Sequence, residues 1–88
     1  MTLSFPNPSR AYDETRKAVR FWGYDQSMEA SFFVSAKALQ LLKPGTSDSG
    51  TALLDVFDSN RPRILEAAVK IYGRGRNGGF YQLGPSDF

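Results

Sequence analysis

The residues that usually carry out catalysis near neutral pH are missing from this chain. Its 88 residues include no histidine and no cysteine. The common general base and every Ser–His or Cys–His nucleophile pair are therefore absent. The carboxylates that remain are scattered, and charge runs usually line solvated faces. We therefore expect no catalytic residue and no cofactor, and an enzyme that works with carboxylates alone stays as a minor alternative.

Two pairs of acids are the candidates for metal binding. Asp13 and Glu14 are adjacent in the sequence, and Asp55 and Asp58 lie one helical turn apart. A site of oxygen ligands at Asp55 and Asp58 stays open, but no loop with the required density of ligands accompanies it. The expectation is therefore that no metal ion is bound.

A basic region follows an acidic one in the second half of the chain. Residues 44–60 carry three aspartates and no base, whereas residues 61–78 carry five bases and one acid, Glu66. The bases are Arg61, Arg63, Lys70, Arg74 and Arg76. The last two lie in a glycine-rich segment, and glycine lets a backbone approach phosphate while arginine pairs with it. The alternative is a helix end followed by a loop, with the arginines near the negative end of the helix.

An aromatic stripe is the second candidate surface. In an extended segment over residues 17–24, Arg20, Trp22 and Tyr24 fall on one face, and Phe33 lies on the corresponding face of the next segment. An exposed patch of this kind would bind a protein partner, a second copy of the chain or nucleic acid. The alternative is that helices or the chain ends cover it, or that both faces of the sheet are packed.

Period-two alternation predicts the strands that position this stripe. Residues 17–24 and 28–34 alternate and are joined by three polar residues, which predicts a β-hairpin. Residues 3–5 form a shorter alternating run that ends at Pro6. Residues 80–83 are expected to form a last strand, and residues 10–16 a loop or a single helical turn.

Capping residues and apolar spacing predict two helices. Ser35 is a good N-cap for residues 36–42, and Lys43-Pro44-Gly45 ends that helix. A second helix begins near Ser49 or Gly50, with apolar residues at three- and four-residue spacing up to residue 72. Pro62 interrupts it. We favour a kinked helix or one that restarts immediately, with Asn60 as its N-cap.

Together these elements predict one domain over residues 1–88 with an α+β fold. The order is strand, strand, strand, helix, helix, strand, which indicates a small antiparallel sheet with helices packed on one face. The longest apolar runs are far shorter than the ~20 residues that span a bilayer, and the first residues do not resemble a targeting signal. We therefore expect a cytoplasmic protein without membrane contact.

The order and spacing of several short motifs resemble one bacterial family. The motifs are residues 3–8 (LSFPNP), 12–13 (YD), 16–21 (RKAVRF), 32–35 (FFVS), 38–39 (AL) and 57–61 (FDSNR) with Ile64. Together they resemble the domain of unknown function 1488, over nearly the whole chain. The resemblance implies a short, cytosolic, stand-alone α+β protein, and it implies no activity, cofactor or catalytic residue.

The sequence therefore favours a small non-enzymatic protein that binds a protein partner or itself, as in a homodimer, through an exposed sheet face. The alternative is a nucleic-acid-binding module that uses the basic region from Arg61 to Arg76, with Trp22 or Tyr81 stacking on bases.

Overall fold

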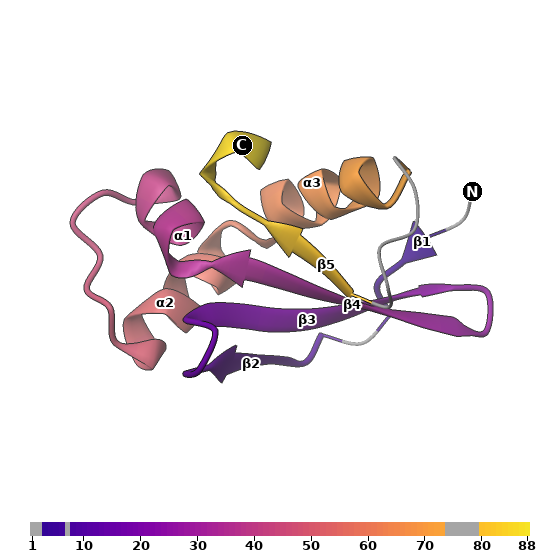
Figure 1. Cartoon of the computed structure of the whole chain (residues 1–88), viewed down its shortest axis with the longest axis horizontal. Helices are drawn as coiled ribbons and strands as arrows, with labels where there is room; N and C mark the ends of the chain where they lie inside the picture. The colour runs from indigo at the N-terminus through magenta and orange to yellow at the C-terminus, as the bar shows by residue number, and fades with distance from the viewer. Residues whose placement is uncertain (1–2, 7, 74–79) are drawn as a thin grey trace.

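The computed structural model describes residues 3–6, 8–73 and 80–88 and shows a five-stranded sheet with helices on one face (Figure 1). The α+β class is confirmed. Along the chain the elements are β1 (Leu3–Ser4), β2 (Arg10–Asp13), β3 (Ala18–Asp25), β4 (Met28–Ser35), α1 (Ala36–Leu42), α2 (Gly50–Ser59), α3 (Arg61–Gly73), β5 (Phe80–Leu83) and the 3₁₀ turn η1 (Pro85–Asp87).

The predicted hairpin of β3 and β4 is confirmed and forms the centre of the sheet. The two strands pair antiparallel along their full length, from Ala18 opposite Ser35 to Asp25 opposite Met28. The turn between them consists of residues 26 and 27, and Gln26 has a φ of 59°. The register places opposite residues of β3 and β4 on the same face of the sheet.

Both N-terminal strands lie along the same edge of β3. β1 pairs with the end of β3 at Tyr24, and β2 pairs with its beginning, from Ala18 to Phe21. Pro6 and Pro8 separate the two strands, because proline cannot donate a ladder hydrogen bond. The expectation that residues 10–16 form only a loop or a helical turn is wrong for β2. An edge strand needs little apolar sequence, and Tyr12 is the residue of β2 that packs against the core.

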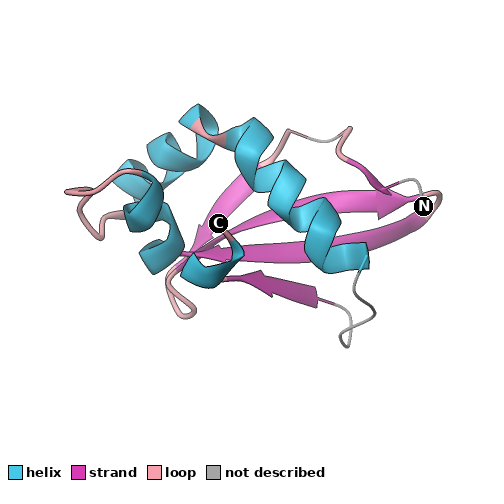
Figure 2. Ribbon diagram, turned by 90° about the horizontal axis from the view of Figure 1, so that it is seen from above, coloured by secondary structure: helices cyan, strands magenta, loops and turns pink. Residues whose placement is uncertain are grey.

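The last strand, β5, runs parallel to its neighbour β4, whereas the other strand pairs are antiparallel. β5 pairs with β4 in parallel, from Ser31 opposite Phe80 to Val34 opposite Leu83, so the sheet is mixed although mostly antiparallel. A parallel connection needs a crossover. Here α1, α2 and α3 provide it, and Figure 2 shows these helices together in front of one face of the sheet.

Side-chain caps fix where the helices begin and end. Ser35 Oγ accepts from the backbone N–H of Ala38, and Ser49 Oγ accepts from that of Ala52. The long second helix predicted from the apolar spacing is two helices, which agrees with an immediate restart. Asn60 ends α2, where its Nδ2 donates to the carbonyl of Val56, and Pro62 follows as the second residue of α3.

The core lies between the helices and the inner face of the sheet, and it is rich in aromatic rings. Phe21 and Phe32 stack with centroids 5.3 Å apart, and Phe57 of α2 lies 5.2 Å from Phe21. Aromatic side chains bury large areas, which lets a chain this short form a core. The largest fully buried side chains are those of Val19, Phe21, Phe32, Val34, Leu39, Leu53, Phe57, Ile64 and Leu83. Within the described residues no helix is long and apolar enough to cross a bilayer.

Candidate functional site

The outer face of the sheet, opposite the described helices, carries the predicted aromatic stripe. Residues of β3 alternate, so Val19 and Phe21 point into the core while Arg20, Trp22 and Tyr24 lie on the outer face. The pairing sets their neighbours across the strands. Arg20 lies opposite Phe33 of β4, which lies opposite Gln82 of β5; Trp22 lies opposite Ser31, which lies opposite Phe80.

Two arginines lie over the aromatic rings of this face. Cζ of Arg20 is 5.1 Å from the ring centroid of Trp22 and 5.6 Å from that of Phe33. Cζ of Arg16 is 4.8 Å from the centroid of Phe33 and 5.8 Å from that of Phe80. These are the distances of cation–π contacts, worth about 0.5–1 kcal/mol each when exposed. We call Arg16, Arg20, Trp22, Phe33 and Phe80 the arginine–aromatic cluster.

The rings of the cluster differ in their exposure. Phe33 is only 6% exposed because the two guanidinium groups and Phe80 cover it, and the rings of Phe33 and Phe80 meet edge to face with centroids 5.7 Å apart. Phe33 therefore lies beneath the other side chains of the cluster, and its ring is not accessible to a ligand. Phe80 is 37% exposed, and Trp22 is partly exposed.

Neither Arg16 nor Phe80 was among the predicted site residues. Arg16 lies in the turn between β2 and β3, within the residues expected to form a loop or a helical turn. Because β2 was not predicted, nothing in the sequence indicated that this turn lies beside the outer face. Phe80 reaches the cluster through the parallel pairing of β5 with β4. The sequence predicts that Phe80 lies on the last strand. No local pattern predicts which residue of β4 lies opposite Phe80, so its place beside Phe33 was not predicted.

The acids on the outer face are engaged within the chain. The backbone N–H and the guanidinium of Arg16 each donate to Asp13 over 3.0 Å, and these bonds hold the pKa of Asp13 below its usual range. Tyr24 Oη donates to Glu29 over 3.0 Å. Arg20 has no such partner. Its Nη2 donates to Ser31 Oγ over 3.1 Å, its Nε is buried without an acceptor, and it forms no ion pair with any described residue.

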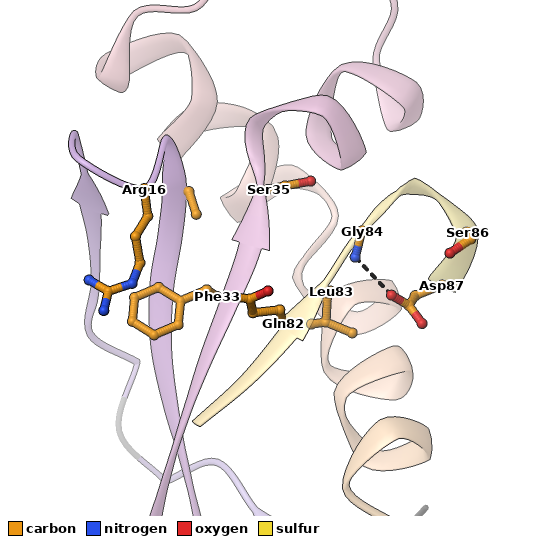
Figure 3. A pocket seen from close by; sticks show the side chains of 9 residues that line it. Arg16, Phe33, Ser35, Gln82, Leu83, Gly84, Ser86 and Asp87 are labelled. Atoms are coloured by element: carbon orange, nitrogen blue, oxygen red, sulfur yellow. Dashed lines mark hydrogen bonds between the residues drawn. The ribbon is translucent and has the colours of Figure 1, made fainter. Parts of the chain in front are cut away.

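A hollow of about 360 Å³ continues the cluster toward the end of β5. Figure 3 shows Arg16 and Phe33 on one side of it and Gly84 with Asp87 on the other. Asp87 accepts a 2.7 Å hydrogen bond from the backbone N–H of Gly84. The residues that line this hollow are Arg16, Ala18, Phe33, Ser35, Gln82, Leu83, Gly84, Ser86 and Asp87.

A second hollow of about 380 Å³ shares Arg16 and Ser35 with the first and adds Lys17 and Lys37. Both lysines are exposed. The first hollow holds one cation and one acid, Asp87, whereas the second holds Arg16 and the two lysines with one acid, Asp48. This arrangement suits the binding of a partner.

The basic region on α3 does not form one continuous surface in the described residues. Arg61 is used within the fold: its Nη2 donates to the carbonyl of Pro8 over 2.7 Å and lies 3.9 Å from Asp58, and its Cζ lies 4.8 Å from the centroid of Phe57. It therefore anchors the N-terminal segment to the helices.

Arg63 and Lys70 are exposed and lie two turns apart on α3, so they share one side of the helix. Glu66 lies between them in the sequence, three residues from one and four from the other, and is also exposed. Arg74 and Arg76 lie outside the described residues.

Asp58, one of the two carboxylates considered for a cation, has a different role. Arg10 donates to both oxygens of Asp58, from Nε over 2.9 Å and from Nη2 over 2.7 Å. These hydrogen bonds hold the pKa of Asp58 below its usual range. The ion pair of Arg10 and Asp58 connects β2 to the end of α2. Across residues 3–6, 8–73 and 80–88, no three acids gather as metal ligands would.

Comparison with known proteins agrees with the resemblance found in the sequence. The model of the family described as "Protein of unknown function (DUF1488)" matches residues 3–83. No curated protein matches the chain. The fold is similar to the crystal structure of a protein of unknown function from the DUF1488 family of Shewanella loihica PV-4. The TM-score is 0.82 and the identity 22%, over 94% of each chain. The resemblance is confirmed, and the chain belongs to the DUF1488 family of proteins of unknown function.

Proposed function

We propose that this chain is a non-enzymatic binding protein that docks on a protein partner through the outer face of its sheet. The observation that carries the proposal is the arginine–aromatic cluster on the face that the described helices leave uncovered. Tryptophan and arginine dominate the energetics of protein interfaces because they bury large, rigid groups. In this cluster the contacts already hold Arg20 between Trp22 and Phe33, so docking costs little further side-chain entropy.

A protein partner suits this face better than single-stranded nucleic acid. Stacking of bases requires open ring faces, whereas Phe33 is buried and the guanidinium groups lie over the rings. The basic region offers little support either, because Arg61 is engaged and Glu66 interrupts the exposed pair on α3. Absence of histidine and cysteine, together with hollows that lack paired acids, supports a binding role over catalysis.

Site-specific photo-crosslinking in the native cell tests the proposal. The crosslinking residue p-benzoylphenylalanine replaces exposed Gln82 on the outer face in one variant and exposed Lys70 on α3 in the matched control. Lysates are treated with nuclease before the adducts are purified. We expect discrete protein adducts from position 82 and none of comparable yield from position 70.

A second change links these adducts to the cluster. Adding Trp22→Ala to the position-82 variant should lower the adduct yield at least about tenfold, as expected for an interface hot spot. Equal adducts from positions 82 and 70, or an adduct yield unaffected by Trp22→Ala, would refute docking through this face. An adduct of twice the mass of the chain would identify the partner as a second copy.

A further inference from the structure

We propose that the partner presents an extended acidic segment whose carboxylates pair with Arg20 and Arg16 on the outer face of the sheet. The inference rests on the proposed function and adds the chemistry of the partner. It starts from the ion pairs of the arginine–aromatic cluster. Arg16 is paired with Asp13, whereas Arg20 is paired with no described acid.

Arg20 is held in place before any partner arrives. Its guanidinium lies against Trp22 and Phe33, at 5.1 and 5.6 Å from their centroids, and Nη2 is fixed by Ser31. Arginine held in this way presents a rigid fork of donors that matches a carboxylate. Because no described residue forms an ion pair with Arg20, its charge is available to an incoming group.

The acids of the face cannot supply that group without breaking existing bonds. Asp13 pairs with Arg16, Glu29 accepts from Tyr24, and Asp87 accepts from Gly84. Glu29 and Asp87 accept from neutral donors and keep their charge, as does Asp48 in the hollow of Lys17 and Lys37. Within the arginine–aromatic cluster, Arg20 is the cation without an acid beside it, and complementarity favours a carboxylate of the partner at that position.

Two cations of the cluster share one ring. Arg16 and Arg20 both contact the ring of Phe33, at 4.8 and 5.6 Å from its centroid, and Arg16 also lines the hollow that contains Lys17 and Lys37. In an extended segment, side chains on one face recur about every 7 Å. Two acidic residues at alternate positions of such a segment would therefore reach Arg20 and Arg16 together.

A second copy of the chain fits this face less well. In a two-fold dimer the same patch meets itself, so with the cluster at the centre of the interface Arg20 would lie near Arg20 of the second copy. Like charges brought together across an interface are unfavourable, and the acids on this face that would relieve them are already engaged.

Selection from a random library of linear 12-residue peptides, displayed on phage, tests the inference with the full chain. We expect Asp and Glu to be enriched in the selected peptides over the unselected library. The synthetic form of the strongest binder should lose about tenfold in affinity for Arg20→Gln, the scale of a charge-assisted hydrogen bond. Arg63→Gln on α3 is the matched control and should bind as the unchanged chain does.

A peptide-side change removes any dependence on the folding of the variant. Replacing the acids of the same peptide by Asn and Gln should lower its affinity for the unchanged chain to a similar degree. Absence of acidic enrichment, failure to select any peptide, or equal binding of the neutral peptide would each overturn the inference. So would tighter binding of a fluorescent single-stranded 12-mer oligonucleotide, or a dimer that Arg20→Gln dissociates.

The two proposals fail in different ways. Protein adducts at position 82 together with neutral selected peptides would leave the docking face standing and refute the acidic partner. Loss of the adducts at position 82 would refute the docking face itself.

Discussion

Replacing Gly23 by alanine tests how the N-terminal segment packs on the sheet. Gly23 is a buried residue of β3 on the core side, and the side chains of Leu3 and Phe5 lie over it. A Cβ at this position would be 2.7 Å from Phe5 Cε1 and 3.1 Å from Leu3 Cδ1. Carbon atoms prefer a separation of about 3.5–4.0 Å, so the ring of Phe5 must move.

The ring has little room to move, and this sets the expected cost. Its centroid lies 6.1 Å from that of Phe21 and 5.9 Å from that of Phe32. Overpacking a core costs about 1–3 kcal/mol, and alanine recovers about 0.5–1 kcal/mol of the penalty that glycine carries in a strand. We therefore expect Gly23→Ala to lower the free energy of unfolding by about 1–2 kcal/mol, out of a total of roughly 4–13 kcal/mol for a domain of this length.

A double-mutant cycle in urea, followed by the fluorescence of the single tryptophan, Trp22, measures this effect. In the Phe5→Ala background the 2.7 Å contact is gone and only the end of the flexible Leu3 side chain remains close, so Gly23→Ala should be neutral or stabilising by up to about 1 kcal/mol. Gly84→Ala is the control, because no atom lies within 4 Å of the added Cβ. The reasoning is wrong if Gly23→Ala stabilises the unchanged chain, or costs as much when Phe5 is absent.

Two further predictions concern an ion pair and a turn. Asp58→Asn removes the acceptor of both hydrogen bonds from Arg10. Because the folded-state pKa of Asp58 lies below its ordinary value of 3.8, its contribution is complete above that pH and is lost as the pH falls through the folded pKa. The difference in unfolding free energy between Asp58→Asn and the unchanged chain should therefore be present at about pH 7 and shrink as the pH is lowered below 3.8, and a difference independent of pH contradicts this. Gln26→Gly relieves a φ of 59° in the hairpin turn, and the net gain of about 0.5–1 kcal/mol should raise Tm by about 2–8 °C. Ser27→Gly, at the turn position without a positive φ, should lower Tm, and a fall in Tm for Gln26→Gly would exclude strain at that residue.

Local signals were enough for the hairpin and for the starts of the helices. The alternation of apolar and polar residues in β3 and β4 depends only on neighbouring residues. It therefore also predicts that Arg20, Trp22 and Tyr24 lie on one face of the sheet and that Val19 and Phe21 lie on the other. Serine caps act within one helical turn, which is why α1 and α2 begin where the sequence predicts.

Distant partners decided the elements that the sequence did not predict. β2 has a single core-facing aromatic, and its Arg10 pairs with Asp58, 48 residues away. The apolar phase that runs through Pro62 gives no sign of how α2 ends. α2 ends at Asn60, whose backbone N–H and side-chain Nδ2 both donate to the carbonyl of Val56 in the last turn of the helix.

The sequence by itself determined that this is a small α+β chain without the usual catalytic side chains, and that one strand face carries arginine beside aromatic rings. Both conclusions depend on composition and on a period of two, which need no knowledge of distant contacts. Only the tertiary structure decided that Arg16 and Phe80 join that face and that Phe33 is buried beneath them. The physical reason is that a turn and a parallel strand pairing bring them together. Tyr81 and Leu83 of β5 belong to the core, and alternation along the strand then places Phe80 on the outer face.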